Sequence, residues 1–232
     1  MCRLRYLLLV FLLLPGTLTS AQSLLKPGKN KYEKGKLVNE RPVGLWEYYD
    51  EAGNKELAVQ YDSSRIVFQR PDTARYELRS GDTWKLGRPS RAPRLLGSHA
   101  KEMRLITGNI RYPGAALREQ VQGDVLISYV VTKEGRATNF TVEKSLSEAC
   151  DQAVWNGLKE RLSTWVPAVY QGRPTDARFY LRATFRIIDS EQDLQESNKR
   201  LQESEARQPY TDHVIITAIF KPINVQLPPQ GL

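Results

Sequence analysis

The side chains that could do chemistry are few in this chain of 232 residues, which has two histidines and two cysteines. His99 and His213 lie far apart, and neither has an aspartate or glutamate at the spacing of a metal-binding motif. A metal site needs about three or four donors. We therefore expect no metal and no cofactor.

Nucleophilic catalysis is the next class to consider. A serine, a histidine and an aspartate can meet from distant segments, so spacing alone leaves a triad open. The chain nevertheless has no Gly-x-Ser-x-Gly turn and no phosphate-binding glycine pattern. Cys150 lies on the apolar stripe of a predicted helix, which favours a buried structural thiol over a nucleophile. These observations predict that the protein is not an enzyme.

A row of arginines is the remaining candidate for recognition. From Ala177 to Ile187 apolar and polar residues alternate strictly, which predicts a strand with one buried and one solvated face. Arg178, Arg182 and Arg186 share the polar face, where they could meet an acidic partner. A solvated face that discourages edge aggregation is the favoured alternative.

The elements around this strand are also readable. Alternation from Val125 to Val131, a turn at residues 133–136 and a return at residues 137–144 predict a hairpin. One stripe of a following helix carries apolar residues at helical spacing: Cys150, Ala153, Val154, Leu158 and Leu162. A shorter helix is expected after Pro113. The fold class is therefore α+β, with two helices packed on a three-stranded antiparallel sheet.

One family shares this order of motifs. Tyr112-Pro113, Gly123-x-Val125, Gly135, Ser145, Trp165-x-Pro167-Ala168 and Gly172-x-Pro174 precede the last strand. The order resembles the C-terminal domain of TonB, over residues 95–188. The resemblance implies a periplasmic domain that binds outer-membrane transporters by accepting a short transporter segment as an extra strand. It places the binding edge on the last strand, at Arg178, Phe179, Tyr180, Leu181, Arg182, Thr184 and Arg186.

The part of the chain before this domain divides in two. Residues 31–69 read as a small antiparallel meander, with a turn at Gly35, and resemble MORN-type and antitoxin-like hairpin repeats. Trp46, Tyr48 and Tyr49 are expected to pack across the hairpin, although they could also form a ligand-stacking surface. Residues 70–94, rich in arginine and proline, are predicted to be an extended linker.

The two ends carry further expectations. Residues 1–21 have the basic, apolar and small-residue layout of a signal peptide, and a retained anchor in the inner membrane is the less favoured alternative. Residues 189–232 read as a polar helix followed by a strand from Val214 to Phe220. This tail is a departure from the TonB family, and it raises the question of whether its strand covers the binding edge.

Two functional hypotheses follow. The first is a non-catalytic periplasmic TonB-like protein that binds partners by strand addition and is linked to TonB-dependent outer-membrane transport. The second is a cell-envelope structural module that uses the fold as a scaffold. The net charge of +8 suits peptidoglycan or an anionic envelope surface, although basic residues that only solvate the surface are the favoured alternative. Export argues against nucleic acid. Strand exchange leaves a homodimer open.

Overall fold

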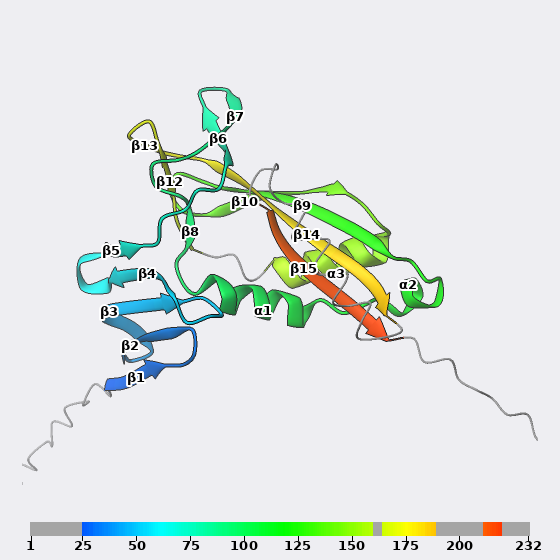
Figure 1. Cartoon of the computed structure of the whole chain (residues 1–232), viewed down its shortest axis with the longest axis horizontal. Helices are drawn as coiled ribbons and strands as arrows, with labels where there is room; N and C mark the ends of the chain where they lie inside the picture. Colours follow the sequence, from blue (N-terminus) through cyan, green and yellow to red (C-terminus); the bar gives the residue numbers. More distant parts are fainter. Residues whose placement is uncertain (1–24, 160–163, 189–210, 220–232) are drawn as a thin grey trace, which may run out of the picture.

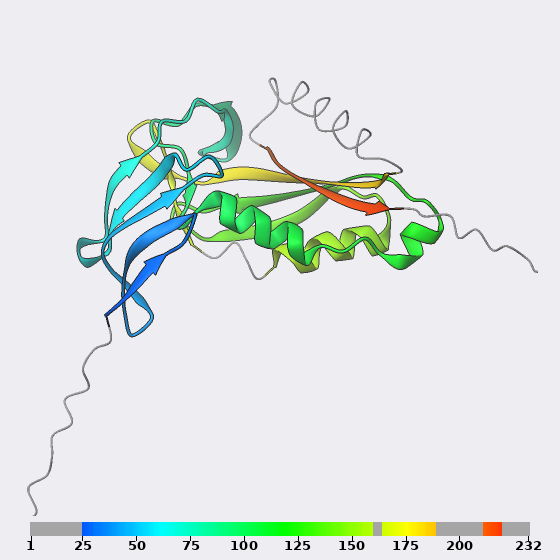
Figure 2. The ribbon, with the colours of Figure 1, turned by 60° about the horizontal axis from the view of Figure 1, so that its bottom comes forward.

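The computed structural model describes residues 25–159, 164–188 and 211–219 (Figure 1). The predicted signal peptide and the predicted polar helix lie outside these ranges. The described residues form two main sheets, one of five strands and one of six. Figure 2 shows the N-terminal sheet at one end of the larger sheet, with α1 and α3 along one face of the latter. No helix within the described ranges is long and apolar enough to span a membrane.

The N-terminal sheet confirms the predicted antiparallel meander and adds a strand. Its order is β1-β2-β3-β4-β5. The strands are β1 (Leu25–Lys29), β2 (Glu33–Val38), β3 (Arg41–Tyr49), β4 (Lys55–Gln60) and β5 (Arg65–Gln69). A short 3-10 helix, η1 (Tyr61–Ser63), joins β4 to β5.

The aromatic residues of β3 build the small core of this sheet. Trp46 and Tyr48 are 5% and 4% exposed, and their rings stack with centroids 6.2 Å apart. The predicted turn at Gly35 is wrong, because Gly35 lies inside β2. A Cβ there would come within 2.2 Å of the Trp46 ring, so glycine is required for close approach rather than for a turn.

The larger sheet contains the predicted three-stranded antiparallel unit, in the order β10-β9-β14. These strands are β9 (Gly123–Val131), β10 (Ala137–Lys144) and β14 (Ala177–Ile188). The helices are α1 (His99–Asn109), the short α2 (Gly114–Arg118) and α3 (Glu148–Leu158). The inward residues of β9 and β14 pack with α1 and α3 in one continuous core. Trp165 is 6% exposed and belongs to this core, with its ring centroid 4.8 Å from that of Phe179.

Residues 70–94 do not form the predicted linker. They contain a hairpin, β6 (Tyr76–Ser80) and β7 (Thr83–Gly87), which joins the larger sheet through Ala177↔Leu78 and Arg178↔Glu77. Tyr76 and Leu78 alternate into the main core at 1% and 0% exposure. These two buried side chains fix β6 against the core. An alternation of only two apolar residues is too short to be recognised in a sequence segment rich in arginine and proline.

Three further pairings complete the described part. β8 (Arg94–Leu95) pairs with β11 (Trp165–Val166), and β12 (Ala168–Tyr170) pairs with β13 (Arg173–Thr175). The predicted tail strand is present as β15 (Thr211–Ile219) and pairs with β14 in parallel.

Candidate functional site

The edge of β14 expected to bind a partner is covered by the protein's own tail. One side of β14 pairs with β9, from Ala177↔Val131 to Phe185↔Gly123. On the other side β6 takes Ala177 and Arg178, and β15 follows from Tyr180↔Thr211 to Ile188↔Ile219. Figure 1 shows β15 running alongside β14. The site is therefore a strand groove that already holds a strand.

The helix-facing side chains of β15 belong to the main core. Val214 and Ile216 lie beside Ala183 and Phe185 in the pairing and are 4% and 5% exposed. They are part of the same apolar cluster as Ile106 of α1. β15 therefore contributes side chains to the main core in addition to pairing its backbone with β14.

The opposite face of β15 is tied to the sheet by a hydrogen-bonded chain across three strands. Thr184 donates its hydroxyl to the carboxylate of Asp124, with an O–O distance of 2.6 Å. The Nε2 atom of His213 lies 2.8 Å from the same hydroxyl oxygen. Because the hydroxyl proton is used by Asp124, the His213 ring must donate through Nε2.

The arginine row is not a uniform free surface. The Arg178 guanidinium lies 2.8 Å from the Glu77 carboxylate and 4.5 Å from the centroid of the Trp84 ring. Tyr180 also donates to Glu77, over 3.0 Å. The first part of the predicted recognition face is thus bound to the β6–β7 hairpin.

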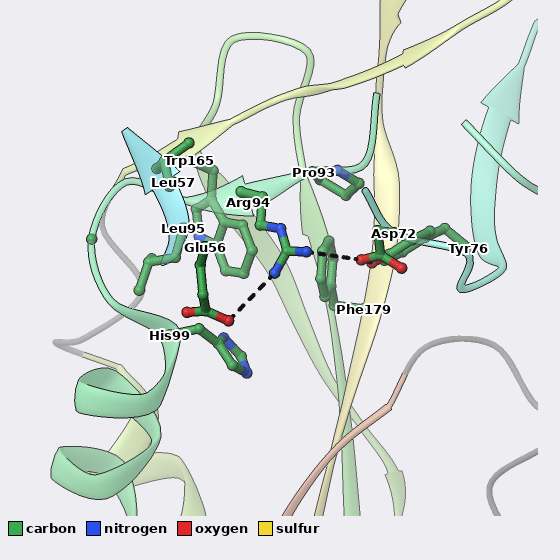
Figure 3. Close-up of a pocket in the computed structure, with 11 residues that line it drawn as sticks. Glu56, Leu57, Asp72, Tyr76, Pro93, Arg94, Leu95, His99, Trp165 and Phe179 are labelled. Atoms are coloured by element: carbon green, nitrogen blue, oxygen red, sulfur yellow. Dashed lines mark hydrogen bonds and ion pairs between the residues drawn. The ribbon is translucent and has the colours of Figure 1, made fainter. Parts of the chain in front are cut away.

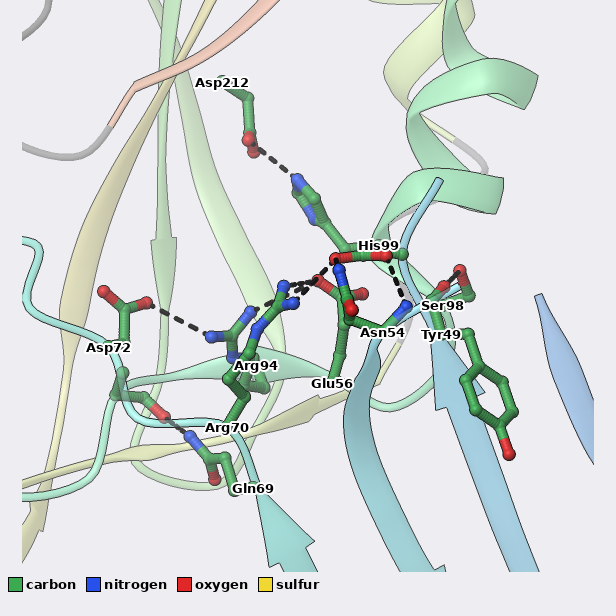
Figure 4. Close-up of polar contacts among 12 residues, drawn as sticks. Tyr49, Asn54, Glu56, Gln69, Arg70, Asp72, Arg94, Ser98, His99 and Asp212 are labelled. Atoms are coloured by element: carbon green, nitrogen blue, oxygen red, sulfur yellow. Dashed lines mark hydrogen bonds and ion pairs between the residues drawn. The ribbon is translucent and has the colours of Figure 1, made fainter. Parts of the chain in front are cut away.

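The start of β15 is anchored by an ion pair that spacing could not reveal. Nε2 of His99, in the first turn of α1, lies 2.9 Å from Oδ1 of Asp212 (Figure 4). Burial alone would lower the pKa of His99, but the Asp212 carboxylate and, more weakly, Glu56 raise it overall. Ser98 holds the start of α1, since its Oγ accepts from the Lys101 N–H at 3.2 Å and donates to the Tyr49 carbonyl at 2.8 Å.

A charged network connects this anchor to the N-terminal sheet. Glu56, which is 6% exposed, lies 2.8 Å from a guanidinium nitrogen of Arg70 and 3.8 Å from one of Arg94. Arg70 also lies 2.7 Å from Asp50, and Arg94 lies 3.5 Å from Asp72. Figure 4 shows Glu56, Arg70, Arg94 and Asp72 close together. Arg70 holds the pKa of the Asp50 carboxyl at about 2.

The cavity within this network is too small for a substrate. It has a volume of about 20 Å³ and is lined by Glu56, Arg94, His99, Trp165 and Phe179, among others (Figure 3). That space corresponds to roughly one water molecule. The residues at this junction are therefore closely packed.

The candidate catalytic groups are not assembled. Cys150 is fully buried in α3, and burial raises the pKa of its thiol. His99, in α1, pairs with Asp212 on the helix side of the sheet, whereas His213 lies on the opposite face, beside Arg182. Within the residues that the structure describes, no cluster of histidine, cysteine and acidic side chains could hold a metal ion.

Comparison with known protein families identifies the larger unit. Residues 108–187 match the family described as Gram-negative bacterial TonB protein C-terminal, and no family matches the N-terminal repeat. Searches of curated proteins and of solved structures gave no match. Domains of this family are non-catalytic and periplasmic and generally engage TonB-dependent outer-membrane transporters. Residues 108–187 of this chain are therefore similar in sequence to a TonB C-terminal domain.

Proposed function

We propose that the protein is a non-catalytic periplasmic adaptor that binds an extended segment of a partner protein along β14. The partner is an outer-membrane TonB-dependent transporter or another envelope protein. The recognition residues in this proposal are those of the predicted edge from Tyr180 to Arg186, because β6 already pairs with Arg178. In this proposal residues 1–21 are a cleaved signal peptide that directs export.

The observation that carries the proposal is the pairing of β14 with β15. All nine residues of β15 pair in register along this edge. An edge that holds one extended segment by backbone pairing and side-chain pockets has the features needed to hold another. The tail then acts as a competitor, and a partner must displace it.

The other outer edge of the same domain is less suitable. β10 departs from regular pairing with β9 between Thr138 and Thr141 and again between Val142 and Lys144. Asn139 has a φ of 53°, outside the extended region. Irregularities of this kind interrupt the ladder that an added strand would need. The proposal therefore assigns partner binding to the β14 edge.

Hydrogen exchange on the full chain tests this assignment. Peptides copied from the N-terminal segments of outer-membrane transporters are added, and amide exchange is followed by mass spectrometry. Exchange should change in β14 and should accelerate in β15 as the tail is displaced, while β10 stays unchanged. Protection centred on β10, or no change at any peptide concentration, would reject the proposed binding edge.

The cell-envelope scaffold is the second candidate. It is favoured by the burial of Val214 and Ile216, because a strand that contributes to the core is costly to remove. In that case β15 should exchange only when the whole domain unfolds, with or without peptide. Mass spectrometry of the N-terminus from fractionated cells separates a processed periplasmic form from an anchored one.

A further inference from the structure

The N-terminal end of β15 carries a buried acidic residue at a position where a core-facing strand usually has an apolar one. Asp212 lies beside Leu181 in the pairing, on the helix-facing side, and is 6% exposed. Val214 and Ile216 follow on that same face. A carboxylate in such a position is costly unless a cation or hydrogen-bond donor meets it. The His99 imidazole meets this carboxylate, with Nε2 2.9 Å from Oδ1.

The position of His99 is determined by elements outside the strand groove. Ser98 caps α1 and is itself bonded to the Tyr49 carbonyl of β3. Glu56 of β4 and Arg94 of β8 act on His99 from the other side with opposite signs. The position of the imidazole is thus set by residues that do not belong to β15.

This arrangement discriminates between registers. A shift of β15 by one residue would turn Val214 and Ile216 to the opposite face and bring a neighbour of Asp212 to His99. A shift by two residues would keep the faces but set an apolar side chain against His99, leaving the Asp212 carboxylate away from it. Only the observed register satisfies both the charge and the apolar pockets.

We propose that His99 forms a carboxylate subsite at the head of the β14 edge, so that this groove selects strands with one acidic residue opposite Leu181 and apolar residues opposite Ala183 and Phe185. β15 is the strand of this kind that the protein supplies itself. The competing partner is an extended peptide that runs parallel to β14 and has an acid followed, two and four residues later, by branched apolar residues. The inference rests on the proposed strand addition at this edge.

Peptide binding to the full chain tests the subsite. A fluorescent peptide with the sequence of residues 209–221 and its D212N version are titrated, by anisotropy, against the Asp212→Asn chain, whose own tail is weakened. The acidic peptide should bind roughly tenfold more tightly, the value of a hydrogen bond to a charged group. A T217V peptide, changed at an exposed outward position, should bind like the parent peptide.

A second pair of chains isolates the role of His99. In the chain that carries both His99→Gln and Asp212→Asn, the preference for the acidic peptide should fall to about twofold or less. The Ile216→Asp chain weakens the tail at a different residue and should retain the preference. It therefore provides a check should the Asp212→Asn chain fold poorly.

The outcomes separate the subsite from strand addition. If both peptides bind the Asp212→Asn chain equally, with β14 protected from exchange, strand addition holds and the carboxylate subsite is wrong. An acid preference that survives His99→Gln would also reject His99 as its origin. If neither peptide binds either weakened chain, strand addition and the subsite both fail.

Discussion

The two outer strands of the three-stranded unit, β10 and β14, differ in how well their edges could hold an added strand. The β14 edge is paired with β15 without a register shift, and it is backed by apolar pockets and a charged anchor. The β10 edge is broken by two register shifts and by Asn139, whose φ is positive. The β14 edge therefore suits an added strand, whereas the irregular backbone of β10 disfavours one. The proposed strand addition is therefore assigned to the β14 side of the domain.

The largest expected effect comes from placing a charge in the occupied groove. Ile216→Asp puts an unpaired carboxylate at a position that is 5% exposed, in the core beneath α1. We expect the free energy of unfolding to fall by about 3–5 kcal/mol, or β15 to leave the groove. Urea unfolding measures the first result, and hydrogen exchange of β14 and β15 measures the second.

The neighbouring residue gives the matched control. Thr217 lies on the other face of β15 and is exposed, so Thr217→Asp should change the free energy of unfolding by less than about 0.5 kcal/mol. Equal losses from the two substitutions would mean that the strand has no distinct buried face. The comparison between the two edges would then lose its physical basis.

Sequence reasoning predicted the parts of this fold whose signal is local. The alternation from Ala177 to Ile187 predicted β14 to within one residue, because each second side chain enters the core. The helical stripe that includes Cys150, Val154 and Leu158 predicted α3 in the same way. In both elements the repeat of apolar residues is long enough to predict the secondary structure without knowing which element packs against it.

The missed features depend on contacts between distant segments. β6 contributes only Tyr76 and Leu78 to the core, and two residues among arginines and prolines do not give a detectable alternation of apolar and polar positions. The pairing of His99 with Asp212 exists only because β15 returns in parallel to the far side of β14. A buried acid in a strand pattern was the available signal: Asp212 continues the inward face of Val214 and Ile216. Such an acid points to a cation, but it cannot identify which one.

The second prediction concerns the charged anchor and its dependence on pH. His99 has a pKa raised above 6.5 in the folded protein, through Asp212 and against the effect of burial. Its contribution to stability is therefore complete below about pH 6.5 and is lost as the pH rises through the folded pKa. Glu56 supports and Arg94 opposes the charged form, and neither reverses the direction.

Two variants isolate this contribution. At pH 6 we expect Asp212→Asn to lower the free energy of unfolding by about 1.5–3 kcal/mol, the range for a hydrogen bond to a charged group. The loss should shrink at pH 8.5, and His99→Gln should flatten the pH dependence of β15 exchange. A loss from Asp212→Asn that grows with pH would contradict the proposed protonation of His99.

A smaller effect is expected from the polar face of the same groove. Thr184→Val keeps the shape but removes the hydroxyl that links Asp124 to His213. The exposed fraction of Thr184 is only 3%, so water does not readily replace the lost bonds. We expect a loss of about 1 kcal/mol, measured by urea unfolding, with Thr217→Val as the exposed control. A loss as large as that of Ile216→Asp would show that the polar face, and not the core face, holds β15.

The smallest effect is predicted at the edge of β10. Val142 of β10 is 43% exposed and lies within the irregular pairing of that strand. Val142→Lys removes little packing and adds a charge that solvent can reach, so the free energy of unfolding should change by no more than about 0.5 kcal/mol. Partner peptides should bind this variant as they bind the unchanged chain, and β15 exchange should not change. If the lysine instead abolished peptide binding, β10 would be the recognition edge, and the closed edge of β14 would be only a means of completing the core.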